Sequence, residues 1–329
     1  MDSGRVIYLN GEFLPEKQAR ISVYDSALMF GDMVFEMTRS FNKKQFKIRE
    51  HLERLYRSMA YLHIKIPHTI DELEKICYEV LDRNDKVFQP HDEHRLMVNI
   101  SRGPLSFYSE IFDGKVEPTV VITDFPFKWT VATMGPLYDT GVNAAIPSQR
   151  AIPASLQEPK VKNRSRMFYM MANIEVSNMS GDRNWALLLD PDGFITEGTG
   201  SNFFIIKGNK LIAPEPRNIL RGVSMEYVIN ELAPAVGLEF EYRNIEPYDV
   251  MNADEAFYTA TPFCMMPCTS INNYKIGTGE VGPWFNKLIT KWGENVGVDI
   301  IKQIKDYGEE VSDLRAKQKT MPSTYQFVK

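Results

Sequence analysis

The stretch DPDGFITEGTGSNFF, residues 190–204, lies between a predicted buried strand and a predicted hairpin. The strand is WALLLD at 185–190, and the hairpin is FFIIKGNKLIA at 203–213, which turns at Gly208-Asn209. Asp192-Gly193 predicts a further tight turn inside the stretch. Taken alone, Glu197 is a turn glutamate in a β-rich region. A functional role for Glu197 is supported only in combination with Lys162, which lies 35 residues upstream.

Outward from this stretch, strands and helices alternate without a fixed repeat. Asn10-Gly11 predicts a tight hairpin between 6–9 and 12–14. Period-two and 3.6-residue patterns predict the remaining elements. Strands are expected at 33–40, 95–101, 120–123, 141–145 and 254–261, and helices at 50–63, 71–81, 165–179, 222–236 and from Pro283. The absence of repeated βαβ units favours a mixed α/β (α+β) fold class.

The length of 329 residues suits two domains of moderate size. The run FPFKWTVATMGP at 125–136 contains two prolines and a glycine, which is typical of a domain connection. We therefore predict a small N-terminal domain at 1–125, a linker at 126–136 and a larger domain at 137–299. Residues 300–329 are more polar and less periodic, and they predict a peripheral helix with a tail.

The composition excludes several classes of function. A net charge of −5 argues against nucleic acid, for which a basic face is expected. No apolar run approaches the roughly 20 residues that cross a bilayer, and the N-terminus lacks a signal pattern, so we expect no membrane association. Three cysteines cannot form a disulfide framework, which favours a reducing cytoplasm.

Three motifs lack the surrounding sequence pattern that their usual function requires. The string Gly277-Thr-Gly-Glu-Val-Gly282 matches a dinucleotide fingerprint, but no buried strand precedes it and a hairpin end leading into the Pro283 helix explains it better. His91-Asp-Glu-His94 is better explained as a solvated turn than as a metal cluster. Cys264 and Cys268 have no second pair for zinc. We expect no metal site.

Four segments carry a specific signal together. They are GDMVFEMTRSF with EHLERLYRS (31–41 and 50–58), PKVKNRSRMFYMMANIEV (159–176), DPDGFITEGTGSNFF (190–204), and ILRGVS with FYTATPF (219–224 and 257–263). In this order and spacing the chain resembles the class IV (fold-type IV) aminotransferases, over residues 5–295. This family includes branched-chain and D-amino-acid aminotransferases, (R)-amine transaminases and aminodeoxychorismate lyase.

The resemblance implies pyridoxal 5'-phosphate bound between a small N-terminal and a larger C-terminal domain of a homodimer. Lys162 matches the Schiff-base lysine, which also moves a proton during catalysis. Its spacing of thirteen residues to Glu175 favours it over Lys160. Glu197 matches the carboxylate that faces the pyridine nitrogen.

The resemblance also implies a phosphate site. Arg54 matches the phosphate-binding arginine, and Val223, Ser224 and Thr261 match the backbone and hydroxyl donors. Without the family, Arg54 is an exposed arginine on an amphipathic helix, and Thr261 is a strand threonine.

The substrate residues depart from the branched-chain pattern. Arg95-Leu96-Met97 stands where those enzymes carry Tyr-x-Arg, and Pro262 has no N–H to offer a carboxylate. We expect Phe35, Arg39, Met97 and Ala260 to face the substrate, with Arg39 binding its carboxylate. The alternative is that Phe35 and Met37 pack in the core and Arg39 forms a structural salt bridge.

The leading hypothesis is transamination from a small amino acid or amine to a keto acid, through a Lys Schiff base and a pyridoxamine intermediate. Branched-chain, amine and D-amino-acid specificities stay open. A lyase of the aminodeoxychorismate type is the first alternative. A non-catalytic binding protein and an NAD oxidoreductase are weaker alternatives, because Lys162, Glu197 and Arg54 are all present.

Overall fold

The computed structural model describes residues 4–181 and 183–317, which form two compact units. Unit 1 comprises residues up to Phe127 together with Val161–Arg166, and unit 2 comprises Lys128–Lys160 and the chain from Met167 onward. The predicted division differs from these units. Residues 161–166 were predicted with the C-terminal domain but belong to unit 1, whereas residues 128–136 and 300–317, predicted as linker and peripheral helix, belong to unit 2. Within the described ranges, no helix is both long and apolar enough to cross a bilayer.

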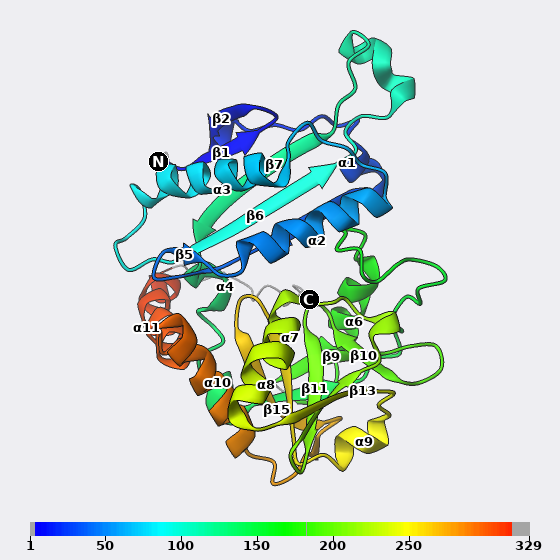
Figure 1. Ribbon diagram of the computed structural model, residues 1–329, viewed down its shortest axis with the longest axis vertical. Helices are drawn as coiled ribbons and strands as arrows, with labels where there is room; N and C mark the ends of the chain where they lie inside the picture. The colour runs from blue at the N-terminus through cyan, green and yellow to red at the C-terminus, as the bar shows by residue number, and fades with distance from the viewer. Residues whose placement is uncertain (1–3, 182, 318–329) are drawn as a thin grey trace. The chain divides into compact units, whose positions relative to one another are not determined.

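Unit 1 is a five-stranded antiparallel sheet in the order β2-β1-β7-β6-β3. Its strands are β1 (Val6–Leu9), β2 (Glu12–Pro15), β3 (Met33–Met37), β6 (His94–Ser101) and β7 (Thr119–Pro126). The helices α2 (Ile48–Tyr61) and α3 (Ile70–Asp85) cover one face (Figure 1). Shorter elements are η1 (Glu16–Gln18), α1 (Ser26–Phe30), β4 (Ser40–Phe41), β5 (Lys44–Gln45) and η2 (Ser106–Phe112).

The core of unit 1 lies between the sheet and these two helices. Leu52, Leu55 and Met59 of α2 repeat at helical spacing and are buried, as the sequence pattern predicts. A capping box formed by Thr69 and Glu72 begins α3. Burial of this apolar face fixes the rotation of α2 and hence the direction of its polar residues.

The strand predicted over Met33–Ser40 is too long. β3 ends at Met37, and Ser40 begins the separate β4–β5 hairpin. Asn42 and Lys43, in the turn of this hairpin, both have positive φ angles. Since Arg39 lies outside β3, it does not share a strand face with Phe35.

Unit 2 contains a nine-stranded mixed sheet in the order β10-β9-β8-β15-β14-β11-β12-β13, with β16 paired to β15. Its strands are β8 (Val142–Ala145), β9 (Asn184–Leu189), β10 (Ile195–Gly198), β11 (Asn202–Lys207), β12 (Lys210–Pro214), β13 (Glu239–Arg243), β14 (Glu255–Ala260), β15 (Cys264–Ile271) and β16 (Tyr274–Lys275). The pairs β8–β9, β8–β15 and β12–β13 are parallel. This mixed topology agrees with the predicted fold class.

The helical elements of unit 2 include several short ones. They are α4 (Lys128–Val131), α5 (Leu137–Thr140), α6 (Met167–Ser177), η3 (Pro216–Asn218), α7 (Val223–Tyr227), the π-helical turn η4 (Val228–Leu232), α8 (Ala233–Val236), α9 (Pro247–Met251), α10 (Pro283–Val296) and α11 (Ile300–Lys317). The predicted helix over 222–236 is thus present with a π-helical turn; Pro234, which has no N–H, interrupts its regular hydrogen bonding. The predicted connection at 126–136 contains α4, and the predicted tail beyond α11 lies outside the described residues.

Candidate active site

Lys162 lies on a short extended segment beside β3, the edge strand of the unit 1 sheet. Asn163 forms an antiparallel bridge with Val34, and the Phe35 N–H donates to the Lys162 carbonyl oxygen over 3.0 Å. The Lys162 N–H donates to Ser58 Oγ of α2 over 3.3 Å. Backbone hydrogen bonds to β3 therefore place this lysine in unit 1, although the chain on both sides belongs to unit 2.

The ring of Phe35 is surrounded by cations. Lys162 Nζ lies 4.9 Å from the ring centroid, and the guanidinium carbons of Arg164 and Arg166 lie at 3.6 and 4.8 Å. A cation over an aromatic face is attracted by the negative charge density of the ring. Phe35 is buried. Its ring therefore holds the three basic side chains of this segment beside β3.

A buried ionic cluster on β3 and α2 contains Arg54. Arg54 Nε and Nη2 donate to the two carboxylate oxygens of Glu36 over 2.6 and 2.7 Å. His51 Nδ1 lies 2.6 Å from Glu36 Oε2. All three side chains are buried. The bidentate pair fixes the plane of the Arg54 guanidinium, which a salt bridge to a flexible surface carboxylate would not do.

The cluster also fixes the protonation of its members. Burial alone would raise the pKa of Glu36, but the charge of Arg54 and the hydrogen bonds from Arg54 and His51 hold it well below its usual range. Burial lowers the pKa of His51, and the charge of Lys162 adds to that effect. Neutral His51 must then donate from Nδ1 to Glu36, which leaves Nε2 as a buried acceptor without a hydrogen-bond partner among the described residues.

Replacing Arg54 with alanine should destabilise the protein by about 3–5 kcal/mol, because it leaves the Glu36 carboxylate buried without its main partner. The double variant Arg54→Ala/Glu36→Gln should recover part of that loss, since no buried charge is then left uncompensated. Urea unfolding of the cofactor-free protein at pH 7 measures both. Additive losses in the double variant would show that the pair is not energetically coupled.

Arg39, the expected carboxylate ligand, is fully buried in unit 1. Its guanidinium carbon lies 3.9 Å from the ring centroid of Phe41 and 3.9 Å from that of Phe127. Arg39 Nε donates to the Ser40 carbonyl oxygen over 3.3 Å. An arginine stacked between two rings suits the structural alternative better than substrate binding.

Arg95 of β6 is a buried arginine with weak hydrogen bonds. Its Nη1 donates to the Thr38 carbonyl oxygen at 3.4 Å, its Nη2 lies 3.8 Å from Met37 Sδ, and its Nε has no partner among the described residues. Burial and the like charge of Arg39 lower the pKa of Arg95 to about 9. The guanidinium therefore keeps its charge at neutral pH and has hydrogen-bonding capacity to spare.

Met97, also predicted to face the substrate, contacts the basic segment after Lys162. Arg164 Nη2 lies 2.9 Å from Met97 Sδ and donates to Asn99 Oδ1 over 2.7 Å. Met97 and Asn99 lie on the same face of β6 by strand alternation. This face of β6 thus holds Arg164.

Glu197 lies on β10 of unit 2 and is buried. Three neutral groups donate to its carboxylate. The Tyr169 hydroxyl donates to Oε1 over 2.8 Å, and Asn202 Nδ2 and the Leu220 N–H donate to Oε2 over 3.1 and 3.0 Å. These donors come from α6, β11 and the loop before α7, so the carboxylate is fixed from three directions.

The predicted phosphate residues of unit 2 lie at two chain turns. Val223 and Ser224 are the first residues of α7, which follows Gly222, and no side-chain hydrogen bond caps this end. Thr261 follows β14 directly, in the tight turn between Ala260 and Cys264, which are themselves paired. A helix start whose amides are not capped by a side chain is suited to an anion.

The chemical types of these groups match those that pyridoxal phosphate requires. Unit 1 supplies an amine and an arginine of fixed orientation, and unit 2 supplies a fixed carboxylate and a helix start. The cofactor has a complementary aldehyde, phosphate and basic ring nitrogen. Each predicted cofactor residue therefore offers the donor or acceptor that one end of that molecule requires.

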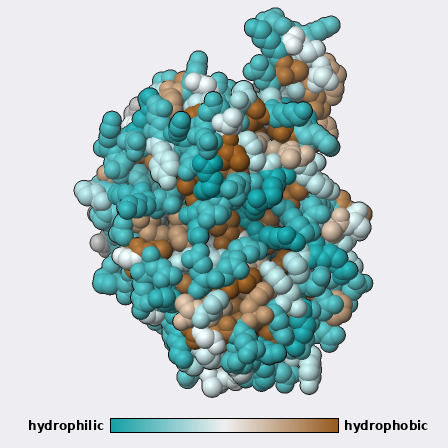
Figure 2. All heavy atoms as spheres, in the orientation of Figure 1, coloured by the Kyte–Doolittle hydropathy of each residue, from teal (hydrophilic) through white to brown (hydrophobic). Residues whose placement is uncertain are grey.

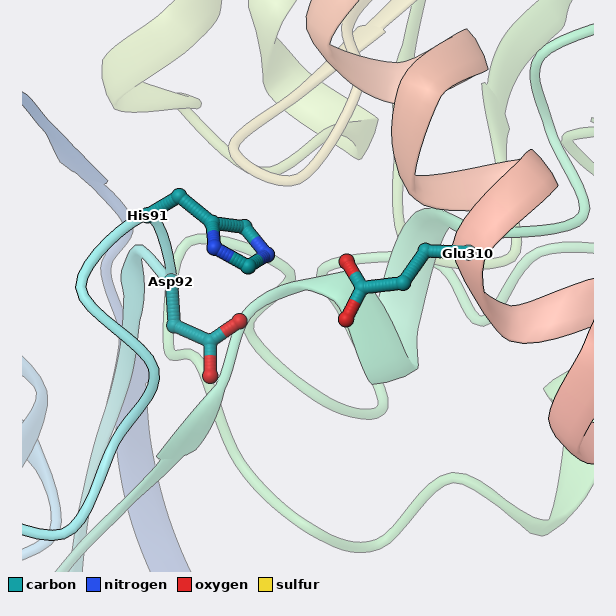
Figure 3. Close-up of side chains that lie close together, drawn as sticks. All are labelled: His91, Asp92 and Glu310. Atoms are coloured by element: carbon teal, nitrogen blue, oxygen red, sulfur yellow. The ribbon is translucent and has the colours of Figure 1, made fainter.

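The segment 91–94, predicted as a solvated turn, is largely buried: Asp92, Glu93 and His94 are buried, and His94 is the first residue of β6. His94 uses both ring nitrogens, with Nδ1 2.8 Å from Asp124 Oδ2 and Nε2 3.1 Å from Asp85 Oδ1. Figure 3 shows the adjacent His91 and Asp92 side chains, drawn with Glu310 of unit 2. Within the described residues of unit 1 this group has two adjacent ligands, fewer than a structural zinc site uses, and we assign no metal here.

Comparison with known proteins identifies the family. The model of "Amino-transferase class IV" matches residues 33–271. The chain belongs to the class IV aminotransferases. A Methanocaldococcus jannaschii protein with a provisional branched-chain-amino-acid aminotransferase name is 35% identical over 300 residues, covering 88% of this chain and 98% of that protein. The D-alanine aminotransferase of Bacillus licheniformis is 27% identical over 278 residues, covering 84% and 92%.

Solved class IV aminotransferase structures share the fold. The T.th. branched-chain amino acid aminotransferase with pyridoxamine 5'-phosphate superimposes with a TM-score of 0.79 at 27% identity, covering 89% of this chain and 94% of that one. This confirms the predicted resemblance, the fold class and the cofactor of the family.

Some residues that contact the candidate site residues were not predicted. Glu36 and His51 lie in segments quoted for the resemblance, but no role was inferred for either. His51, Arg54 and Ser58 follow one another at spacings of three and four, which predicts one helix face. That spacing could have indicated a buried polar stripe on α2 beside its apolar one. Tyr169 was also missed; its hydroxyl reaches Glu197 from α6.

Proposed function

We propose that this aminotransferase moves the amino group of a small amino acid with an apolar side chain to a keto acid, using Lys162 as its catalytic amine. The observation that carries the proposal is the Glu197 carboxylate, which is buried and fixed by three neutral donors. A pyridine nitrogen that must stay protonated requires a carboxylate of fixed position and orientation.

Bound pyridoxal phosphate supplies an aldehyde that binds amines and a ring that withdraws electrons. Lys162 Nζ would hold the cofactor through its aldehyde and would move the proton at the donor Cα. The charge on Glu197 keeps a proton on the ring nitrogen, while Tyr169 and Asn202 prevent the carboxylate from rotating away.

We assign the phosphate to Arg54, Val223, Ser224 and Thr261. Arg54 is oriented by Glu36 through two hydrogen bonds, and a planar guanidinium binds phosphate well in a fixed orientation. The N–H groups of Val223 and Ser224 begin a helix, where the backbone dipoles favour an anion. Thr261 adds a hydroxyl.

Arg95 replaces Arg39 as our proposed ligand for the substrate carboxylate. Arg95 keeps its charge but has weak hydrogen bonds, whereas Arg39 is stacked between two rings. Met37 lies against the Arg95 guanidinium, and Met97 is two residues away on the same strand face. Thioether side chains adapt to apolar groups of varied shape. These residues support a carboxylate-bearing substrate with an apolar side chain.

The variant Arg95→Gln should raise KM for the keto acid by about tenfold or more and lower kcat much less, because the lost interaction binds the substrate carboxylate before and during the reaction. Steady-state kinetics with a keto acid and the matching amine that lacks a carboxylate separate the two effects. The activity of the variant with the amine should fall little. Equal losses for both substrates would contradict a role in carboxylate binding.

We also propose that the chain forms a homodimer. Unit 1 exposes a group of large apolar side chains near α1 and η2: Ile21, Val23, Leu28, Met29, Phe30, Phe107 and Ile111. Figure 2 shows hydrophobic atoms on the projecting segment that includes η2. Exposed apolar clusters of this kind favour association. Light scattering after gel filtration should give twice the chain mass of 37.8 kDa, and a monomer at micromolar concentration would contradict the proposal.

A donor screen tests the function. Branched-chain L-amino acids, D-alanine and a chiral primary amine are each incubated with the enzyme and no acceptor, and the cofactor spectrum is followed. If the enzyme is an aminotransferase, its donor should convert the bound cofactor completely to the amine form. A keto acid should then restore the original spectrum. Release of product over many turnovers without a keto acid would indicate the lyase alternative instead.

A further inference from the structure

Asn202 is the first residue of β11 and lies at a junction of three elements of unit 2. It is 5% exposed, and its backbone pairs with Thr259 of β14. Its side-chain Nδ2 donates to Glu197 Oε2 over 3.1 Å and to the Leu220 carbonyl oxygen over 2.7 Å. Both neighbours are acceptors, so the amide can lie only with its NH₂ group toward them.

These contacts close a ring. The Leu220 N–H donates to the same Glu197 oxygen over 3.0 Å, so the carboxylate, the amide of Asn202 and residue 220 hold one another. Leu220 is two residues before Gly222, the residue that directly precedes α7. The ring therefore ties the carboxylate on β10 to the loop that leads into the helix start.

The other end of the Asn202 side chain abuts that helix start directly. A Cβ built on Gly222 would lie 2.1 Å from Asn202 Oδ1, which is closer than atoms can approach. Gly222 has an ordinary φ of −71°, so space rather than backbone conformation requires glycine here. Asn202 thus contacts the carboxylate through Nδ2 and the residue before α7 through Oδ1.

We propose that Asn202 is a positioning residue that sets the distance between the Glu197 carboxylate and the start of α7. The inference rests on the proposed function, in which these groups hold the ring nitrogen and the phosphate of one cofactor. A rigid molecule can engage both ends only if their separation matches its own length. Asn202 makes the two ends one rigid unit.

The inference predicts a specific loss in Asn202→Ala. Pyridoxal phosphate and pyridoxal, which lacks the phosphate, are titrated into the cofactor-free protein and followed by absorbance. The wild type should prefer the phosphorylated compound strongly. In Asn202→Ala this preference should shrink by about tenfold or more, because both ends are no longer engaged together. A merely stabilising side chain would weaken both ligands equally.

The variant Asn202→Asp should change the pH dependence of cofactor binding. It places a carboxylate where an amide now lies 3.1 Å from Glu197 Oε2. Two adjacent carboxylates share a proton, so the pair should titrate at higher pH than Glu197 does alone. The pH below which pyridoxal phosphate is released should rise by about one unit or more relative to the wild type.

Gly222→Ala and a control complete the test. Gly222→Ala should reduce the preference for the phosphate as Asn202→Ala does, and the double variant should be no worse than either single one, because removing the Asn202 side chain makes room for the new methyl group. Asn218→Ala removes an amide from the same loop that bonds Asp190 and not Glu197, and should leave the preference unchanged. Melting temperatures of the cofactor-free variants report folding.

The outcomes separate the two claims. An unchanged preference in Asn202→Ala, or fully additive losses in the double variant, would overturn the role of Asn202 while leaving the proposed function intact. Failure of the wild type to bind pyridoxal phosphate would instead overturn the proposed function.

Discussion

Replacing Lys162 with alanine is expected to lower amino-transfer activity by about 10⁴-fold or more. In the proposed function, the variant loses both the amine that would attach the cofactor and the base that would take the Cα proton. Because the segment is held to β3 by its backbone, through the Phe35 N–H to the Lys162 carbonyl oxygen and the bridge at Asn163, the substitution should leave unit 1 folded. Initial rates with the preferred donor, together with melting temperatures, measure both effects.

Lys160→Ala is the matched control. Lys160 is two residues away, but its Nζ pairs with Glu158 Oε1 over 2.8 Å and donates to the Arg217 carbonyl oxygen over 3.3 Å. A partly exposed ion pair contributes little to stability, so this variant should keep most of the activity. An inactive Lys160→Ala beside an active Lys162→Ala would show that the assignment has been made to the wrong lysine.

The second large effect is expected for Glu197→Gln, which should lower kcat by about 100-fold or more while KM changes little. The glutamine oxygen can accept from Asn202 and Leu220, and its NH₂ group can donate to the Tyr169 hydroxyl, so the hydrogen bonds of the site are preserved. Only the negative charge is lost, and with it, in the proposed function, the group that keeps the ring nitrogen protonated. Single-turnover kinetics and the absorption spectrum of the bound cofactor report the change.

Glu175→Gln provides the comparison for that variant. Glu175 lies on α6 and accepts from the Ser148 N–H and hydroxyl over 2.6 and 2.8 Å. These bonds lower the pKa of Glu175 despite partial desolvation, but they tie a loop and involve no cofactor group. The control should retain near-normal kcat. A kcat in Glu197→Gln equal to that of the control would mean that the carboxylate does not act on the ring.

Local sequence signals were sufficient for much of the fold. The apolar repeat of Leu52, Leu55 and Met59 predicts α2, and Asn10-Gly11 predicts the first hairpin; both are present. Period-two patterns failed where the chain leaves a sheet without a glycine or proline to mark it. That is why β3 was predicted to extend to Ser40 and not to end at Met37.

The site depends on contacts that span long stretches of sequence. No local pattern indicates that residues around Lys162 pair with β3, because the two segments are more than a hundred residues apart. The stacking of Arg39 between Phe41 and Phe127, and the weak bonding of Arg95, follow from packing in three dimensions. In contrast, the spacing of His51, Arg54 and Ser58 was visible in the sequence and could have predicted a polar face on α2.

One measurement tests the central claim most directly. The enzyme is incubated with pyridoxal phosphate, reduced with borohydride, digested and mapped by mass spectrometry. We predict a single stable phosphopyridoxyl addition on the peptide that contains Lys162, and none when the donor amino acid has first converted the cofactor to its amine form. Addition at Lys160 or another lysine, or no addition at all, would contradict the account.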